Sequence, residues 1–361
     1  MMGRWTHTKV TERLRTALPI VQGPFGGGLS SVALASAVSN AGGLGSFGCH
    51  HLGAEGIAEV AAAIRANTRG PFALNLWLPF DGSDGPKITA GEYREVVDSL
   101  APFFDELGVT APPLSAYSVP DFNEQIEALL AARPAVFSFV YGIPDAAILA
   151  RCRELDIVTL GAATTVEEAM ALERAGVDMV VASGFEAGGH RVAFLAPPED
   201  NLMGTFSLVP QIVDALSIPV IAAGGIADGR GIAAAMTLGA DGVQIGTAFL
   251  ACAESGTTDL HRDKLFSEDA RHTGLTRVFS GRLARGIRNR LMEEAPHLSL
   301  APYPVQNWLM GQLKRAAIEA ARPELMSLWS GQSAPLLRHK RAAELIDSLV
   351  TETEAALAGF A

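Results

Sequence analysis

The feature that most constrains the fold is a repeated alternation of short apolar runs with longer stretches rich in Ala, Leu and Glu. Apolar runs without polar alternation are typical of parallel strands buried on both faces, and the stretches between them predict helices. The predicted strands are residues 19–22, 43–47, 72–77, 135–141, 157–161, 179–183, 219–223 and 242–245. The predicted helices are residues 30–40, 54–67, 145–155, 166–175, 205–216 and 229–238.

This rhythm predicts an α/β protein with a closed (β/α)8 barrel of the TIM type, because eight strand–helix units in about 250 residues match the usual size of that fold. Local signals agree with the predicted helices. Gly176 and Gly239 directly follow two of them and suit the left-handed conformation that ends a helix, and Thr164 or Thr165 is placed to cap another. A doubly wound open sheet is the alternative fold.

The predicted barrel occupies residues 15–255 and carries an insertion at about 79–122. This insertion is rich in Pro, Gly and Asp and is longer than a normal strand–helix connection, so we expect it to cover one mouth of the barrel. The strand–helix rhythm stops near residue 255. Residues 256–361 therefore predict a mostly helical part, with helices at 307–321 and 342–356, that packs on the barrel and covers the active site. The apolar positions of 306–313 are interpreted as packing.

Composition excludes several classes of protein. Hydrophobic residues make up 48% of the 361 residues and charged residues 19%, which excludes a disordered chain. The net charge of −11 argues against a general nucleic-acid or membrane binder. Cys49, Cys152 and Cys252 are too widely spaced for a disulfide framework or a metal site. The uncharged stretch 16–54 is broken by Pro and Gly, so we expect no membrane span and a cytoplasmic location.

Two glycine-containing turns, residues 223–229 and 244–247, follow the last two predicted strands. In barrels these turns commonly bind phosphate. Glycines such as Gly225 and Gly246 let the main chain approach an anion, and the unpaired N–H groups at a helix start donate hydrogen bonds to it. The alternative interpretation is that the glycines only form tight strand-to-helix turns.

A histidine, His190, ends the sequence GFEAGGH that follows the predicted strand 179–183. This position places an imidazole at the catalytic end of the barrel, where it is a candidate base near neutral pH. A structural histidine is the alternative. Glu186 could orient His190, or could instead form a surface salt bridge or a main-chain contact.

From about residue 19 to 332 the chain resembles the nitronate monooxygenases, the FMN-dependent group formerly called 2-nitropropane dioxygenases. The matching segments are 19–24, 39–45, Asn75, 186–190, 224–231, 244–247 and 328–332. The resemblance implies a TIM-like barrel with an added substrate domain and FMN at the barrel mouth. It also implies that flavin oxidises an alkyl nitronate or nitroalkane and is reoxidised by dioxygen, giving a carbonyl compound and nitrite.

The resemblance further implies a role for individual residues, with His190 as the catalytic base. The implied FMN-binding residues are Gln22, Gly23 and Pro24 along the flavin, Asn75 as its hydrogen-bond partner, Ser183, Gly188 beside the isoalloxazine or ribityl chain, and Gly225, Gln244, Ile245, Gly246 and Thr247 at the phosphate. The implied partners are a small carbon acid and dioxygen, without metal, nucleic acid or membrane. A homodimer is compatible with the sequence, which does not set the oligomeric state.

Three positions depart from the family pattern. Ser183 stands where many relatives carry Gln, Phe25 where Met is usual, and Val140 where close relatives often carry a second His. The last change makes the pocket more apolar, which favours a larger substrate or one that is not a nitronate. The alternative enzymes are FMN-dependent NAD(P)H enoyl-thioester or quinone reductases. A barrel that binds a phosphate-bearing ligand without redox chemistry is the alternative outside enzymes.

Overall fold

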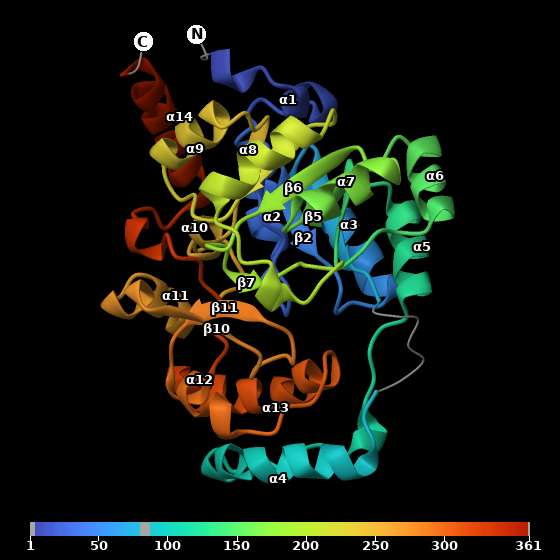
Figure 1. Ribbon diagram of the computed structural model, residues 1–361, viewed down its shortest axis with the longest axis vertical. Helices are drawn as coiled ribbons and strands as arrows, with labels where there is room; N and C mark the ends of the chain where they lie inside the picture. Colours follow the sequence, from blue (N-terminus) through green and yellow to red (C-terminus); the bar gives the residue numbers. More distant parts are fainter. Residues whose placement is uncertain (1–3, 80–86, 360–361) are drawn as a thin grey trace.

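The computed structural model describes residues 4–79 and 87–359, and a closed barrel of eight parallel strands forms its centre (Figure 1). The strands follow the order β1-β9-β8-β6-β5-β4-β3-β2, and a parallel bridge from Val21 to Leu44 closes the ring. The barrel strands are β1 (Ile20–Gln22), β2 (Gly45–Gly48), β3 (Phe72–Trp77), β4 (Val136–Val140), β5 (Val158–Ala163), β6 (Met179–Ser183), β8 (Val220–Ala223) and β9 (Gly242–Ile245). The predicted barrel is therefore confirmed, and each predicted strand lies in it.

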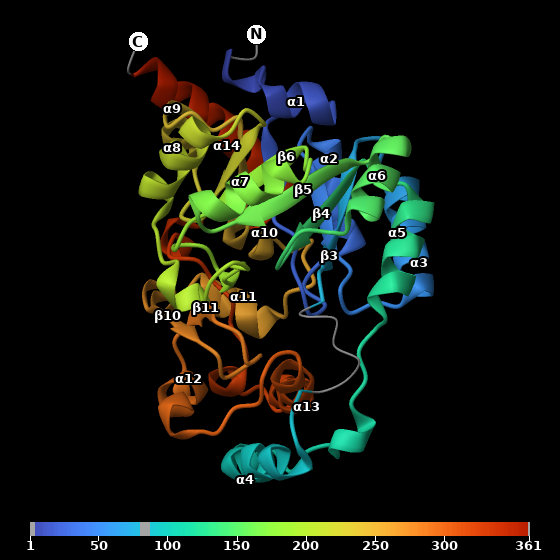
Figure 2. The same cartoon turned by 45° about the vertical axis from the view of Figure 1, so that its right-hand side comes forward.

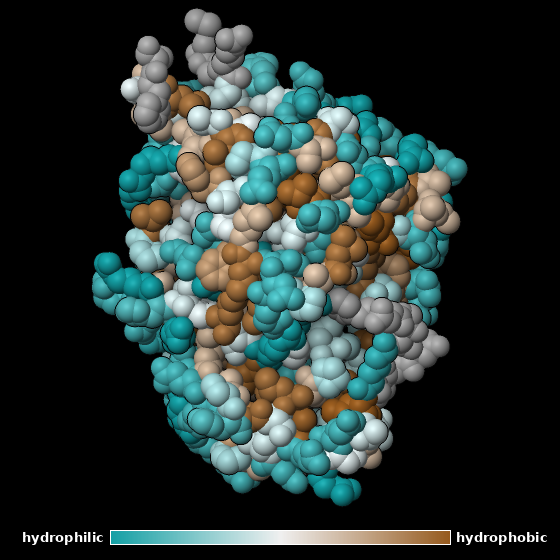
Figure 3. Space-filling model, viewed as in Figure 1, coloured by the Kyte–Doolittle hydropathy of each residue, from teal (hydrophilic) through white to brown (hydrophobic). Residues whose placement is uncertain are grey.

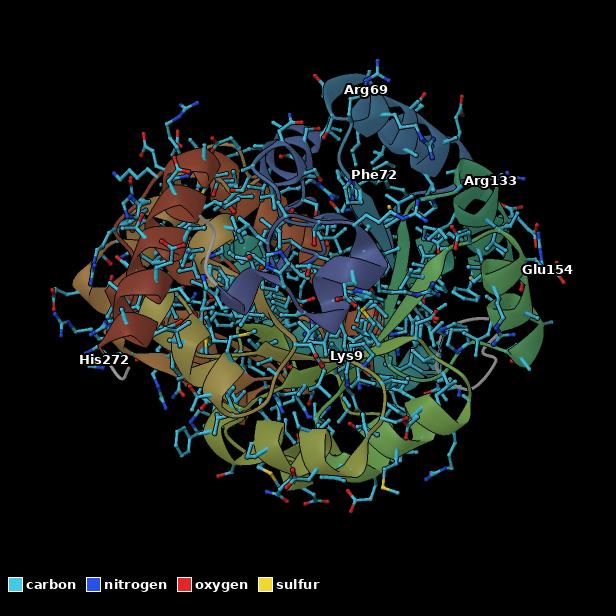
Figure 4. The ribbon with its side chains drawn as sticks, turned by 90° about the horizontal axis from the view of Figure 1, so that it is seen from above. Lys9, Arg69, Phe72, Arg133, Glu154 and His272 are labelled. Carbon is cyan, nitrogen blue, oxygen red and sulfur yellow. The ribbon has the colours of Figure 1, made fainter. Side chains whose placement is uncertain are left out.

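Within residues 4–79 and 87–359, eight helices surround the barrel. They are α2 (Val32–Asn40), α3 (Ala54–Asn67), α5 (Phe122–Ala132), α6 (Ala146–Glu154), α7 (Val166–Arg174), α8 (Thr205–Ala215), α9 (Gly229–Thr237) and α14 (Ala342–Ala358). Thr165 caps α7 by accepting from the Glu168 N–H, as a threonine at a helix start does. A further helix, α1 (Lys9–Leu14), closes the amino-terminal end of the barrel, where Val10 and Leu14 pack on strand residues. Viewed from above in Figure 4, Lys9 lies near the middle of the ring of helices.

Helix α14 comes last in the chain and packs against α9 and α2, so it occupies the place of the eighth outer helix. The N–H of Gly229, at the start of α9, donates to the Glu352 carboxylate at 3.0 Å. A Cβ at position 229 would collide with the Thr353 nitrogen and with Glu352. Glycine is thus the residue that lets the two helices approach this closely.

A second lobe lies at the carboxyl ends of the strands and has its own apolar core. Its elements are α4 (Ala90–Glu106), α11 (Asp259–Leu265), α12 (Arg290–Glu294), α13 (Val305–Glu319) and an antiparallel sheet of β10 (Thr273–Thr276), β11 (Ala284–Ile287) and β7 (Gly189–His190). In Figures 1 and 2, α4 lies at the end of the molecule away from the barrel, with α13 between them. Leu100 and Phe103 of α4 belong to the same buried cluster as Leu309 and Leu313 of α13. The described part of the insertion therefore packs on this lobe, whereas we expected it to cover the barrel mouth.

On the face in Figure 3, hydrophobic side chains gather in several separate areas among hydrophilic ones. Among residues 4–79 and 87–359, no helix has the length and apolar character that crossing a bilayer requires. The same residues include no group of three His, Cys, Asp or Glu side chains placed to hold a metal ion.

We expect Gly229→Ala to weaken the contact between α9 and α14, because the added methyl group has no space. Overpacking of this kind costs about 1–3 kcal/mol. The apparent melting temperature should fall, as measured by circular dichroism. Gly91→Ala in α4 is the control, because its Cβ would meet no atom nearer than 3.9 Å. Equal melting temperatures for the two variants would show that the close approach at Gly229 does not limit stability.

Candidate active site

A cavity of about 460 Å³ lies at the carboxyl ends of the barrel strands, between the barrel and the second lobe. Every residue that the sequence assigned to the site lines it, except Gln22 and Ile245. The lining therefore includes Gly23, Pro24, Asn75, Ser183, Gly188, His190, Gly225, Gln244, Gly246 and Thr247. These residues are far apart in the sequence and meet because parallel strands end on one rim of the barrel.

Gln22 and Ile245 are buried in the barrel below the cavity. The Gln22 amide donates to the Gly23 carbonyl at 2.7 Å and accepts from the Ser46 N–H at 2.9 Å. Ile245 belongs to the main apolar core. The side chains of both residues therefore support the strand ends that carry Gly23 and Gly246, and neither faces the cavity.

Asn75 offers one free polar atom to the cavity. Its Nδ2 donates to the Ser138 hydroxyl at 3.0 Å, so the amide is held in one orientation. Its Oδ1 has no hydrogen bond to any described residue. Asn75 can therefore accept a hydrogen bond from a ligand bound against the end of β3.

The turns after β8 and β9 present main chain to the cavity. Gly224 and Gly225 have φ of 102° and 75°, which side-chain-bearing residues rarely adopt. A Cβ at Gly246 would meet no atom nearer than the Phe25 ring at 4.0 Å, so this glycine borders open space. The short helix α10 (Thr247–Leu250) begins directly after Gly246. This arrangement suits a phosphate held by backbone N–H groups.

Residues 329–331 line the cavity, and the segment 329–332 joins these turns to the loop that carries His190. The Gly331 N–H donates to the Thr247 hydroxyl at 2.9 Å, and the Gln332 N–H donates to the Glu186 carbonyl at 3.0 Å. A Cβ at Gly188 would collide with the Gly331 nitrogen. Gly188 is thus required by the contact with this segment, whatever else it borders.

His190 lies in β7, which pairs with β11 of the second lobe. Its Nε2 lies 2.8 Å from the Ser280 hydroxyl, and the ring centroids of Trp77 and Trp329 lie 5.2 and 5.4 Å from its own. The Ser280 hydroxyl also donates to the Arg282 carbonyl at 3.1 Å, which it can do while accepting from Nε2–H. To donate to Nε2 in the other neutral tautomer, it must turn away from that carbonyl. Nδ1 has no hydrogen bond to a described residue and is the nitrogen left for a ligand.

Burial, and secondarily the positive charge of Arg282, lowers the pKa of His190 to about 3. The imidazole is therefore neutral at neutral pH. A group with so low a pKa is a weak base, because efficient proton abstraction requires a pKa near the working pH. A neutral imidazole can donate or accept a hydrogen bond at the cavity.

Two charged side chains fix the loop between β6 and β7. The Glu186 carboxylate accepts from the Thr205 N–H and hydroxyl, each at 2.9 Å, so it forms a main-chain contact at the start of α8 and does not orient His190. The buried Arg191 guanidinium donates to the carbonyls of Ser183, Gly184 and Asn201 at 2.6–3.1 Å. Charge-assisted hydrogen bonds of this kind hold the main chain next to His190.

The sequence missed several residues of the cavity wall. His50, after β2, stacks on Trp77 with ring centroids 3.6 Å apart and planes at 3°. The face of α13 supplies a further set, Asn307, Met310, Gly311, Lys314, Arg315 and Ile318. Their spacing of three to four residues is the helical repeat and could have marked a shared face. It did not show that this face borders a cavity.

Comparisons with known proteins agree with this geometry. A family model described as nitronate monooxygenase matches residues 7–352. A Staphylococcus aureus protein named "Probable nitronate monooxygenase" is 38% identical over 351 residues, which cover 96% of this chain and 98% of that protein. The solved nitroalkane oxidase from Streptomyces ansochromogenes is 36% identical, with a TM-score of 0.89 over 98% of this chain and 99% of that chain. FabK from Thermotoga maritima is 27% identical, with a TM-score of 0.74 over 98% of each chain.

We expect Gly246→Val to abolish flavin retention, because the valine side chain would fill the space that a phosphate needs. The same side chain would displace no protein atoms, so the fold should be retained. Flavin released by heat and measured per mole of protein gives the readout. Gly53→Val is the control, since its Cβ also meets no atom within 4 Å and Gly53 does not line the cavity. Full flavin retention in Gly246→Val would contradict the phosphate site.

A buried histidine of the second lobe predicts sensitivity to acid. His261 lies 3.0 Å from the Trp329 carbonyl, and burial lowers its pKa from 6.5 to about 4. Between these pH values the unfolded chain binds a proton that the folded chain does not, so stability is present above pH 6.5 and is lost as the pH falls toward 4. A shift of this size corresponds to on the order of 3 kcal/mol.

We therefore expect His261→Gln to reduce the loss of unfolding free energy between pH 7 and pH 4.5, as measured by urea denaturation. His7→Gln, at an exposed histidine, is the control. If the two variants lose stability equally over this range, His261 does not cause the acid sensitivity.

Proposed function

The chain belongs to the nitronate monooxygenase family, and we propose that it oxidises alkyl nitronates with dioxygen to a carbonyl compound and nitrite. The family makes it a flavin-dependent oxidoreductase acting on nitro compounds. The observation that carries the finer proposal is the position of His190. This neutral imidazole lines the same cavity as the glycine turns and has one nitrogen free.

The residues of the cavity fit FMN as the flavin. Gly225, Gly246 and Thr247 would hold the phosphate, because the main chain at Gly246 borders open space. Gly23 and the free Oδ1 of Asn75 border the same cavity and would contact the ring system. When bound, FMN supplies the two-electron acceptor for the substrate and the reductant for dioxygen.

The ionisation state of His190 supports a nitronate as the substrate. A neutral nitroalkane must first lose a proton from carbon, and a base with a pKa of about 3 is poorly matched to that step. A nitronate has already lost this proton. We infer that, with substrate bound, Nδ1 of His190 carries the ring proton and donates it in a hydrogen bond to a nitronate oxygen. The Ser280 hydroxyl then turns away from the Arg282 carbonyl, which lies 3.1 Å from it, and donates to Nε2. In place of the base role that the resemblance implies, we propose a substrate-binding role for His190.

An anaerobic titration tests this function. We expect the flavin absorbance of the purified holoenzyme to bleach on addition of an alkyl nitronate and to return on addition of dioxygen, with nitrite as product. NADH and NADPH are added in parallel. Bleaching by a nicotinamide alone, without a response to nitronate, would assign the chain to the reductases instead.

We expect His190→Asn to retain flavin and to lower kcat/KM for the nitronate about 10- to 100-fold, because a hydrogen bond to a charged group contributes about 1.5–3 kcal/mol. Stopped-flow reduction of the flavin measures the effect. Reduction by dithionite serves as the control, because it needs no substrate-binding residue. An unchanged rate with nitronate would remove His190 from the reaction.

A further inference from the structure

One cationic side chain of the cavity wall has no assigned role. Lys314 lies on the face of α13 that borders the cavity. Among the described residues it forms no hydrogen bond and no ion pair, and burial lowers its pKa. The residue is half-buried at the cavity wall. An ammonium group partly removed from water without a partner is unfavourable unless something else supplies the opposite charge.

The surrounding residues do not supply that charge. Glu186 is the one acidic residue among the described lining residues, and its carboxylate already accepts hydrogen bonds from Thr205. Burial, and then the charge of Lys314, lowers the pKa of His51, and the same charge contributes to the lowered pKa of His261. The ammonium therefore lies among neutral or cationic groups. The wall's other cation, Arg315, is exposed to solvent.

We propose that Lys314 is the counter-charge for the substrate and selects the anionic nitronate over its neutral nitroalkane acid. This inference rests on the proposed function, because it concerns the same cavity and the same substrate class. A lysine suits the task, since its flexible stem carries a compact charge that can follow a small anion. The product nitrite is also a monovalent oxyanion and is bound by the same group.

The role of Lys314 as a counter-charge can be distinguished from the role of His190 by comparing an anionic with a neutral ligand. A hydrogen-bonding imidazole contacts the nitro oxygens whether or not the substrate carries a net charge. An ammonium group discriminates between the anion and the neutral acid, because only the anion gains Coulombic energy from it. Loss of Lys314 should therefore affect the nitronate far more than the nitroalkane of the same carbon skeleton.

The test compares Lys314→Met and Lys314→Arg in the holoenzyme, with Lys264→Met as the matched control. Lys264 pairs with Asp269 and does not line the cavity. We expect Lys314→Met to lower kcat/KM for the nitronate about 10- to 100-fold and Lys314→Arg to restore most of the loss. The inhibition constant of the neutral nitroalkane, measured as a competitor of the nitronate, should change less than twofold. If Lys314→Met and Lys264→Met behave alike, the proposal is overturned.

A binding measurement separates failure of this inference from failure of the proposed function. Nitrate, a redox-inert oxyanion, is titrated into the oxidised holoenzyme while the flavin spectrum is followed. We expect its dissociation constant to rise at least tenfold in Lys314→Met and to stay unchanged in Lys264→Met. If the wild-type enzyme oxidises no nitronate but binds nitrate through Lys314, the proposed function fails and the anion site stands. Nitrate affinity that does not depend on Lys314 overturns the anion site even if nitronate is oxidised.

Discussion

Closure of the parallel barrel is the constraint on which the rest of the structure depends. The bridge between Val21 and Leu44 completes the ring, so all eight strands end on one rim. Closure also requires close packing behind the strands: a Cβ at Gly45 would collide with the Ala35 carbonyl of α2. Because the rim is common to all strands, residues as distant in sequence as Gly23 and Gly246 border one cavity. The strand topology thus sets the position of the site, and the individual side chains set its chemistry.

The chain from β6 to the residue after β7 supplies the buried arginine and the histidine of the site, Arg191 and His190. Arg191 is almost fully buried, and its burial is offset by three carbonyl acceptors, with Glu168 and Glu186 adding favourable charge. This arrangement holds the neighbouring His190 against Ser280 in the interior. The burial that fixes the ring also keeps it neutral. Burial therefore both fixes the position of the His190 ring and lowers its basicity. A weakly basic ring favours a nitronate, which has already lost the proton from its carbon.

The sequence predicted those parts of the molecule that depend on local pattern. Apolar runs located the strands, and glycines after two strand ends located Gly225 and Gly246 at the cavity. It could not predict contacts made across long distances in the chain, such as Gly331 against Thr247 or the cavity face of α13. The strand β11 was missed because it is short and contains Arg285, which is buried through contacts with Thr273 and the Phe185 loop that no local pattern reveals.

The cavity offers two kinds of group for binding an anion: main-chain N–H groups and the ammonium group of Lys314. The turns at Gly225 and Gly246 present main chain, which can bind a phosphate without a lysine or arginine cluster. Such a cluster would repel Lys314 and would also raise the cost of keeping Arg191 buried. Because the phosphate is assigned to uncharged N–H groups, the ammonium of Lys314 is left for a second anion. An acidic protein with a net charge of −11 can in this way hold an anionic cofactor and an anionic substrate in one cavity.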